Sequence, residues 1–268
     1  MAGVLRARVR GIEMAYDDRG HGPAVVLLHG FPFDRSMWDE QADALAGSYR
    51  VITPDLRGMG ETTAGDGPAT MDEMAHDVAA LMDKLGVERA VVGGLSMGGY
   101  VALAFYRRHR LRARALLLAD TRPGADTDEA RKTREEQARK ILGAGAGVIA
   151  DDFLKKVLTP ATLAERPGVA ARVCEMILKT NARGAAAALR GMALRHDQTS
   201  FLEDVLVPAL ILVGSEDKLT PPAEAEVMRR EIRGSRLQVI EGASHLSNVE
   251  RPDEFNRALK TFLDELQP

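Results

Sequence analysis

The chain has 268 residues, with 36 Lys and Arg against 39 Asp and Glu and a formal net charge of −3. This length suits one large domain with a substantial core, or a core that carries an inserted subdomain. The near balance of charges, without a block of one sign, argues against nucleic acid as a partner.

No stretch of the chain predicts a targeting or membrane segment. Residues 5–10 alternate apolar side chains with arginine, which is the period of a strand and lacks the apolar core of a signal peptide. The apolar run at 24–28 is too short to cross a membrane. The single cysteine, Cys174, excludes an internal disulfide and is expected to be a buried thiol on a helix. We therefore expect a cytoplasmic protein with no membrane partner.

Strands and helices alternate in the first half of the chain. Residues 4–9 and 12–17 alternate in polarity and precede a Gly-Pro turn, which predicts an antiparallel opening pair. The next strand, 25–28, is continuously apolar, as expected of a central strand covered by helices on both faces. Further strands are predicted at 50–53, 91–95 and 113–120. Helices are predicted around 37–41 and over 70–86 and 97–109, with Thr70 and Glu73 forming a capping box.

The strand pattern disappears from Arg122 to about Asp204. Amphipathic helices are predicted there over 128–142, 149–158, 168–180 and 181–194, with Met176, Ile177, Met192 and Leu194 in their core. Strands return at 208–213 and 237–240, and a last helix covers 252–266. We therefore predict an α/β fold with a mostly parallel central sheet, helices on both faces and an inserted helical cap. Residues 1–121 and 205–268 form the core, and residues 122–204 form the cap.

An apolar run ends in Gly94-Leu95-Ser96-Met97-Gly98, and a helical pattern begins at once. A strand that turns directly into a helix strains the residue between them, and small residues two positions before and after it let the two backbones pass. Such a turn raises the Ser96 hydroxyl off the end of the sheet and places it over the free N–H groups of the following helix. This pattern predicts that Ser96 is a nucleophile. The spacing of Gly93 and Gly98 also fits a phosphate-binding loop, but that loop continues with Lys and then Ser or Thr, and this chain continues with Gly99-Tyr100.

Three loops at the ends of predicted core strands carry Ser96, Asp217 and His245, in that chain order. A serine hydroxyl alone is a weak nucleophile, so a neutral imidazole must accept its proton, and a carboxylate must orient that imidazole and stabilise its charged form. We predict that these three residues form a catalytic triad. Asp120, at the end of the strand before the cap, is the alternative acid, although it could instead cap the turn that follows it.

Five stretches together resemble the α/β-hydrolase family, and the resemblance covers essentially the whole chain. They are His29-Gly30-Phe31-Pro32, Pro54-Asp55-Leu56-Arg57-Gly58, Gly94-Leu95-Ser96-Met97-Gly98, Val213-Gly214-Ser215-Glu216-Asp217 and Gly242-Ala243-Ser244-His245. The resemblance implies an oxyanion hole made by the main-chain N–H groups of Met97 and Phe31. It also implies that His29 shapes its loop without a catalytic role. Asp55 and Arg57 are expected to form structural ion pairs.

Within this family the chain looks similar to small capped esterases, enol-lactone hydrolases and cofactor-free haloperoxidase-like enzymes. The resemblance implies a serine carboxylesterase that cleaves small esters through an acyl-enzyme, with no metal and no cofactor. Serine at position 96 argues against the dehalogenase and epoxide-hydrolase branches, which use aspartate there. The alternatives are a lactone, enol-lactone or carbon–carbon bond hydrolase with the same triad, and a sensor that binds a small ligand in the same pocket. The substrate and the oligomeric state stay open.

Overall fold

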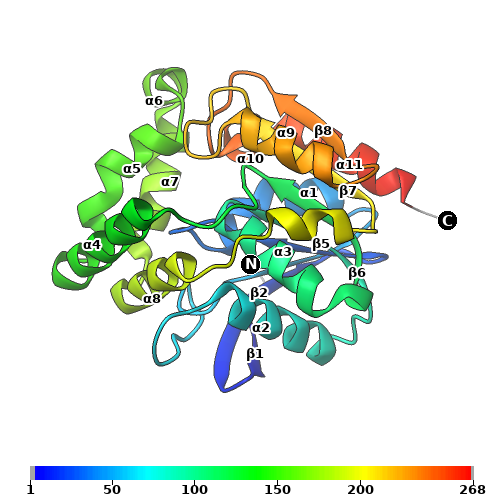
Figure 1. The fold of residues 1–268 in the computed structure, drawn as a ribbon, viewed down its shortest axis with the longest axis horizontal. Helices are drawn as coiled ribbons and strands as arrows, with labels where there is room; N and C mark the ends of the chain where they lie inside the picture. The colour runs from blue at the N-terminus through cyan, green and yellow to red at the C-terminus, as the bar shows by residue number, and fades with distance from the viewer. Residues whose placement is uncertain (1–3, 267–268) are drawn as a thin grey trace.

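The computed structural model describes residues 4–266, which form an eight-stranded sheet with helices around it (Figure 1). The strands are β1 (Leu5–Val9), β2 (Ile12–Arg19), β3 (Ala24–Leu28), β4 (Arg50–Pro54), β5 (Ala90–Leu95), β6 (Ala113–Ala119), β7 (Ala209–Gly214) and β8 (Arg236–Ile240). Their order is β1-β2-β4-β3-β5-β6-β7-β8. The β1–β2 and β2–β4 pairs are antiparallel, and every pair from β4 to β8 is parallel. The predicted α/β class, the mostly parallel sheet and the antiparallel opening pair are confirmed.

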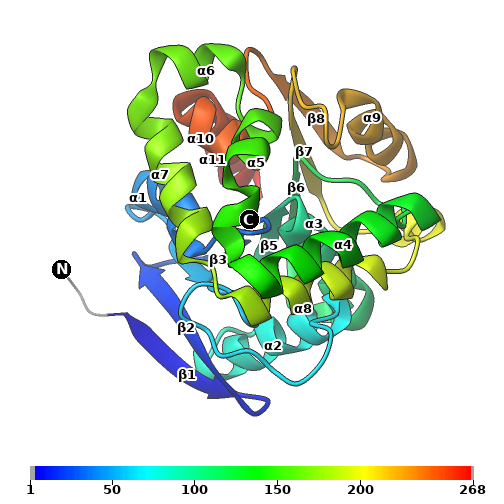
Figure 2. The ribbon, with the colours of Figure 1, turned by 90° about the vertical axis from the view of Figure 1, so that its left-hand side faces the viewer.

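Both faces of the sheet are covered by helices (Figures 1 and 2). Outside residues 122–204 these are α1 (Asp39–Leu45), α2 (Met71–Lys84), α3 (Met97–Arg108), α9 (Pro222–Glu231), α10 (Ser247–Glu250) and α11 (Pro252–Glu265). Alternate residues of β3 enter two different apolar clusters, one shared with α2 and α3 and the other with α1 and α11. Because both faces are buried, β3 has the continuous apolar sequence from which its central place was predicted.

Capping residues mark where some of these helices begin, as at α2. Two helices, α9 and α10, have too few buried apolar residues to show a helical period in the sequence. Thr70 caps α2 as expected, with its hydroxyl accepting from the Glu73 N–H at 3.2 Å and the Glu73 carboxylate accepting from the Thr70 N–H at 3.3 Å. The sequence pattern did not predict α9, which buries only Ala225 and Met228, or the four-residue α10. Such stripes are too short to establish a period. Short 3-10 helices lie at Arg35–Trp38, Arg110–Arg112, Ala146–Ile149 and Thr199–Asp204.

Residues 122–204 carry helices and no strand. The α-helices are α4 (Asp128–Ala144), α5 (Ala150–Val157), α6 (Pro160–Glu165), α7 (Pro167–Lys179) and α8 (Ala182–Ala193). Four of them were predicted, and the six-residue α6 was not. They gather at one side of the sheet, on the left of Figure 1 and toward the viewer in Figure 2. Within residues 4–266, no helix is long and apolar enough to cross a membrane.

Side-chain burial in this helical segment agrees with the sequence pattern except near its exposed edges. Met176, Ile177 and Met192 are buried as predicted. The prediction for Leu194 was wrong, because this residue follows the last turn of α8 and is 60% exposed. The prediction that Cys174 is buried was also wrong, because its side chain is only partly covered at the edge of an apolar cluster.

Helix α8 lies directly against the loops that connect β4 to α2. A Cβ atom on Gly184 would clash with the backbone of Gly58, and one on Gly191 would clash with the backbone of Ala69. The two glycines are about two helical turns apart, so they lie on one face of α8. The Ala69 N–H also donates to the carbonyl of Ala187 at 3.0 Å. The main chain of α8 therefore packs on the main chain of these loops with no side chain between them.

Candidate active site

Ser96 lies in the sharp turn between β5 and α3. Its backbone angles are φ 55° and ψ −114°, in a region that non-glycine residues rarely adopt. Two hydrogen bonds hold the turn, because the Ser96 N–H donates to the Ala119 carbonyl at 3.0 Å and the Thr121 hydroxyl donates to the Ser96 carbonyl at 2.9 Å. Strain of this kind persists only where the surrounding structure fixes it, and it is common at functional sites.

The two glycines around the serine explain how the turn can form. A Cβ atom on Gly94 would clash with the backbone of Gly98, and a Cβ atom on Gly98 would clash with the Leu28 carbonyl in the neighbouring strand. Both positions therefore need glycine, for the reason inferred from the sequence. The turn occupies the middle of the sheet, because β5 lies between β3 and β6.

Asp217 and His245 meet at the ends of β7 and β8, 2.8 Å apart between Oδ2 and Nδ1. Their side chains are almost inaccessible, at 0% and 4% exposure. The other carboxylate oxygen, Oδ1, accepts from the main-chain N–H groups of Leu219 at 2.8 Å and Thr220 at 3.0 Å. The Thr220 hydroxyl donates to Oδ2 at 2.7 Å and lies 3.3 Å from His245 Nδ1. The carboxylate is thus fixed on both sides and directed at the imidazole.

These contacts favour the ionised form of Asp217. Burial by itself raises the pKa of a carboxyl group, since it removes water from the charged form. The charge of His245 and the hydrogen bonds from His245 and Thr220 outweigh this effect, and the pKa of Asp217 lies below its ordinary value.

Asp120, the alternative acid, is buried near this pair and has other partners. Its Oδ1 accepts from the Gly214 N–H at 2.8 Å, and its Oδ2 accepts from the Ser247 hydroxyl. Burial, followed by the nearby charge of Asp217, raises the pKa of Asp120 well above its ordinary value. Among residues 4–266, Asp217 is the carboxylate that is hydrogen-bonded to His245.

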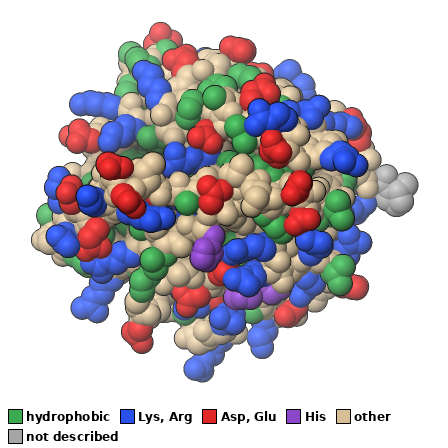
Figure 3. Space-filling view, viewed as in Figure 1, with side chains coloured by type: hydrophobic (Ala, Val, Ile, Leu, Met, Phe, Trp, Pro, Cys, Tyr) green, Lys and Arg blue, Asp and Glu red, His purple; other side chains and the backbone are tan. Residues whose placement is uncertain are grey.

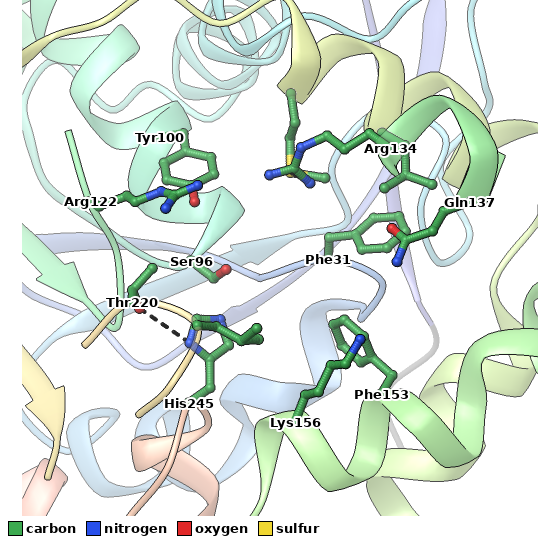
Figure 4. A pocket seen from close by; sticks show the side chains of 13 residues that line it. Phe31, Ser96, Tyr100, Arg122, Arg134, Gln137, Phe153, Lys156, Thr220 and His245 are labelled. Atoms are coloured by element: carbon green, nitrogen blue, oxygen red, sulfur yellow. Dashed lines mark hydrogen bonds between the residues drawn. The ribbon is translucent and has the colours of Figure 1, made fainter. Parts of the chain in front are cut away.

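Ser96 and His245 line one pocket, with a cavity volume of about 180 Å³ (Figure 4). Within the described residues no hydrogen bond joins the Ser96 hydroxyl to the imidazole. Phe31 also lines the pocket, and its N–H donates no main-chain hydrogen bond among residues 4–266. Met97 is the first residue of α3, so its N–H belongs to the four that a helix leaves without an internal acceptor.

His29, Asp55 and Arg57 make structural contacts outside the pocket. The fully buried His29 accepts from the Leu56 N–H at Nε2, 2.9 Å away, which ties two loops together, and burial lowers the pKa of its imidazole. Asp55 forms an ion pair with Arg35 and accepts from the Arg35 N–H at 2.7 Å. Arg57 pairs with Asp77 at 2.6 Å.

Sequence reasoning did not single out Thr220, Arg122 or Arg134, all of which line the pocket. The contact of Thr220 with Asp217 could have been expected from the sequence. An aspartate side chain commonly accepts from the main-chain N–H groups two and three residues later, and Thr220 is three residues after Asp217. No sequence signal places the two arginines in the pocket, since Arg122 lies in a loop and Arg134 on a polar helix, where charged side chains are usually solvated. In the part of the chain that the structure describes, no cluster of three or more His, Cys, Asp or Glu side chains could hold a metal ion.

A mostly parallel sheet with a serine at a strand-to-helix turn, and a carboxylate–histidine pair at neighbouring strand ends, is the arrangement of α/β hydrolases. A family model described as the alpha/beta hydrolase fold matches residues 23–252. The chain belongs to this family and is a hydrolase.

Three known proteins show the range of its relatives. The structure of a thermophilic esterase from Thermogutta terrifontis, with malate bound, is 41% identical, covers all of both chains and has a TM-score of 0.96. The enol-lactonase from Burkholderia xenovorans LB400 is 32% identical, with 97% of this chain and all of that chain covered and a TM-score of 0.91. The 3-oxoadipate enol-lactonase 2 of Acinetobacter baylyi is 28% identical, with 97% of this chain and 95% of that protein covered.

Proposed function

We propose that the protein is a serine carboxylesterase that cleaves small esters. The observation that carries this proposal is the buried Asp217–His245 pair, 2.8 Å apart, beside Ser96 in one pocket. A carboxylate bound to Nδ1 fixes the imidazole so that its other nitrogen, Nε2, can accept a proton from the nucleophile. Relatives named as an esterase and as enol-lactonases support the same chemistry.

The proposed reaction is an acyl transfer in two halves. Ser96 attacks the ester carbonyl as His245 takes the hydroxyl proton, and the N–H groups of Met97 and Phe31 stabilise the negative oxygen that forms. His245 then gives the proton to the departing alcohol, which leaves an acyl group on Ser96. Water, activated by the same imidazole, releases the acid and restores the serine. Asp217 stays ionised and stabilises the imidazolium in both halves.

We further propose that residues 122–204 act as a cap over the core formed by residues 1–121 and 205–268. Side chains of α4, α5 and α8 line the pocket opposite Ser96, which supports this division. A pocket covered in this way favours short acyl chains and excludes polymers. The cytoplasmic location expected from the sequence stays a prediction.

The second candidate is hydrolysis of a lactone or enol-lactone with the same residues, and the enol-lactonase relatives favour it. Hydrolysis of a carbon–carbon bond and ligand sensing without turnover are further alternatives. A panel of p-nitrophenyl esters of increasing acyl length, together with lactones, separates these functions. We expect the highest kcat/KM on short esters. A single burst of acyl release without steady turnover on any of these compounds would identify a sensor.

Ser96→Ala is the direct test of the nucleophile. We expect kcat to fall by about 10⁴- to 10⁶-fold with the fold intact, because the hydroxyl that forms the acyl-enzyme is removed. Ser200→Ala, at an exposed position on a 3-10 helix, is the matched control and should leave kcat unchanged. A serine-directed sulfonyl fluoride should inactivate the wild type and label Ser96. If Ser96→Ala kept more than a tenth of the activity, the assignment of Ser96 would be wrong.

A further inference from the structure

The pocket at Ser96 has a charge pattern that ester hydrolysis alone does not require. Arg122, Arg134 and Lys156 line it, and among residues 4–266 no Asp or Glu does so. On the molecular surface in Figure 3, by contrast, acidic and basic side chains are interspersed. The pocket is therefore selectively cationic in a protein whose net charge is slightly negative.

The two arginines that line the pocket pair with a single buried carboxylate, that of Asp126. Asp126, whose side chain is fully buried, pairs with Arg122 at 3.2 Å, with Arg195 at 2.7 Å and with Arg134. Glu224 is the other carboxylate that acts on Arg122, through its charge. Three guanidinium groups therefore share one directly bonded carboxylate.

Arg195 shares the single negative charge of Asp126 with Arg134, which makes the closer contact. The Arg195 side chain is 2% exposed, and it donates to the carbonyl of Gly124 at 2.9 Å and to that of Met192 at 3.2 Å. Its guanidinium also lies 4.3 Å from the centre of the Tyr100 ring. Arg195 is thus fixed in a structural role, which leaves the positive charges of Arg122 and Arg134 only partly balanced at the pocket wall.

Both wall arginines keep donors for a further acceptor. The Nε of Arg122 is buried and has no hydrogen-bond partner within the described residues. Arg134 uses Nε and Nη2 on Asp126, and its Nη1 reaches only the sulfur of Met192 at 3.5 Å, a weak acceptor. In Figure 4 the guanidinium of Arg134 points into the cavity, and that of Arg122 lies beside Tyr100 on the same side. A partly buried donor without a good acceptor is costly, and an anionic ligand group would be a better acceptor for Arg134 Nη1 than the sulfur of Met192.

We propose that the substrate carries a carboxylate, which Arg122 and Arg134 bind while the scissile carbonyl lies at Ser96. The proposal rests on the esterase function given above and narrows its substrate class to half-esters of short dicarboxylic acids or to lactones with a free carboxylate. Arg134 can donate to such a carboxylate through Nη1, and Arg122 through the donors that Asp126 leaves free, in charge-assisted hydrogen bonds. Phe153, Leu189 and Leu219 line the pocket as well and offer apolar contacts to a short carbon chain between the two ends.

Two esters of equal chain length test this specificity. Mono-p-nitrophenyl glutarate carries a carboxylate at the far end of its acyl chain, and p-nitrophenyl valerate has a methyl group there. We expect the wild type to have a kcat/KM about tenfold to a hundredfold higher on the glutarate ester, the range for losing a hydrogen-bonded ionic contact. Equal kcat/KM values on the two esters would overturn the proposal.

Arg122→Gln tests whether Arg122 is responsible for the preference for the glutarate ester. It removes the charge and should lower kcat/KM on the glutarate ester to near the valerate value, a much larger loss than on the valerate ester. Arg134→Lys keeps the charge but loses Nη1 and the paired bonds to Asp126, so we expect a smaller loss on the glutarate ester, again larger than on the valerate ester. Arg139→Gln, on the exposed side of α4, is the matched control and should change neither. An equal loss on both esters in Arg122→Gln would contradict anion recognition.

Binding measured without turnover separates this proposal from the proposed function. Calorimetry of Ser96→Ala with glutarate should show binding that Arg122→Gln weakens at least tenfold in the same background. If the wild type hydrolyses neither ester but glutarate binding still depends on Arg122, the esterase function is wrong and the anion site stands. If the wild type hydrolyses both esters and glutarate binding is independent of Arg122, the esterase function stands and the anion site is wrong.

Discussion

Strands β6 and β7 lie side by side, and each ends at a buried aspartate, but the two carboxylates have different partners. Asp217, after β7, faces His245, which can carry a positive charge, and its pKa lies below the ordinary value. Asp120, after β6, faces only neutral donors within the described residues, from Gly214 and Ser247, and burial raises its pKa. Two like charges so close together are unfavourable, so the partners decide which carboxyl group is ionised.

The two aspartates also differ in what they hold in place. The Gly214 N–H lies three residues before Asp217, and the Ser247 hydroxyl lies two residues after His245. Asp120 therefore joins the loop of Asp217 to the loop of His245, whereas Asp217 contacts the imidazole itself. We infer that Asp120 positions these two loops and that Asp217 acts on the reacting imidazole.

Among changes at the two aspartates and their partners, Asp217→Asn should have the largest effect. An amide cannot stabilise the imidazolium and can hold the wrong tautomer, so kcat should fall by about 10³- to 10⁴-fold on a short ester. Circular dichroism and the unfolding midpoint should stay close to those of the wild type. An active Asp217→Asn beside an inactive Asp120→Asn would reverse the two roles.

Asp120→Ala should have the next largest effect, and it should act on stability as well as on rate. It leaves the Gly214 N–H and the Ser247 hydroxyl without their acceptor, which costs about 1–3 kcal/mol for each group that stays buried and unpaired. Displacement of the two loops should lower kcat by up to about a hundredfold. Urea unfolding and steady-state kinetics measure the two losses. Unchanged stability would show that Asp120 does not hold the loops.

Thr220→Val tests the support of Asp217 at a finer level. The change removes the hydroxyl that donates to Asp217 at 2.7 Å and keeps the shape of the side chain. A hydrogen bond of this kind contributes about 0.5–1.5 kcal/mol, so kcat should fall about two- to tenfold. Thr133→Val, at an exposed position on α4, is the control and should have no effect on kcat. A loss as large as that of Asp217→Asn would show that Thr220 does more than support the carboxylate.

Asp120→Asn should have the smallest effect on rate, together with a diagnostic pH dependence of stability. The raised pKa of Asp120 favours its neutral form, and an amide of similar shape replaces it, so kcat should stay within about threefold. The pKa of Asp120 is raised in the folded protein, so the folded wild type keeps the Asp120 proton to a higher pH than the unfolded chain does. The contribution of Asp120 to stability therefore decreases as the pH rises above about 4.

The wild type should therefore lose stability relative to Asp120→Asn as the pH rises from 5 toward the raised pKa of Asp120. The slope is at most about 1.4 kcal/mol per pH unit. Asp217, with its lowered pKa, acts in the opposite direction and contributes stability that is lost as pH falls below its unfolded value. Comparing both proteins isolates Asp120, because Asp217 is present in each. Urea unfolding at pH 5 and pH 8 measures the difference, and a difference independent of pH would contradict a raised pKa.

Features fixed by the local chain were predictable from the sequence. The strained turn at Ser96 needs glycine at positions 94 and 98, and the chain carries both glycines at the spacing that such a turn requires. The central strands were predictable because both of their faces are buried. A loop at the end of such a strand is a common place for a ligand-binding residue, which is why Asp217 and His245 were predicted as site residues.

Features that depend on docking between distant segments were not predictable. Arg134 lies on α4, a strongly polar helix that buries only Ala138 and Ile141. Its place in the pocket follows from how α4 packs on α8 and from Asp126, and periodicity gives the face of a helix but not its position. Asp217 was predicted as the acid, with Asp120 as the alternative because each follows an apolar strand, and only the fold shows which of them reaches His245.

The contact of α8 with the loops after β4 has a consequence for changing the enzyme. Gly184 and Gly191 let the main chain of α8 pack directly on the main chain of these loops. The helix therefore forms a rigid wall of the pocket, because any displacement would break close contacts along its length. Leu189 and Met192 project into the pocket from that wall. Shortening these side chains should enlarge the room for substrate while leaving the frame in place. A directed-evolution library that aims at bulkier esters should therefore vary Leu189 and Met192 and keep the two glycines constant.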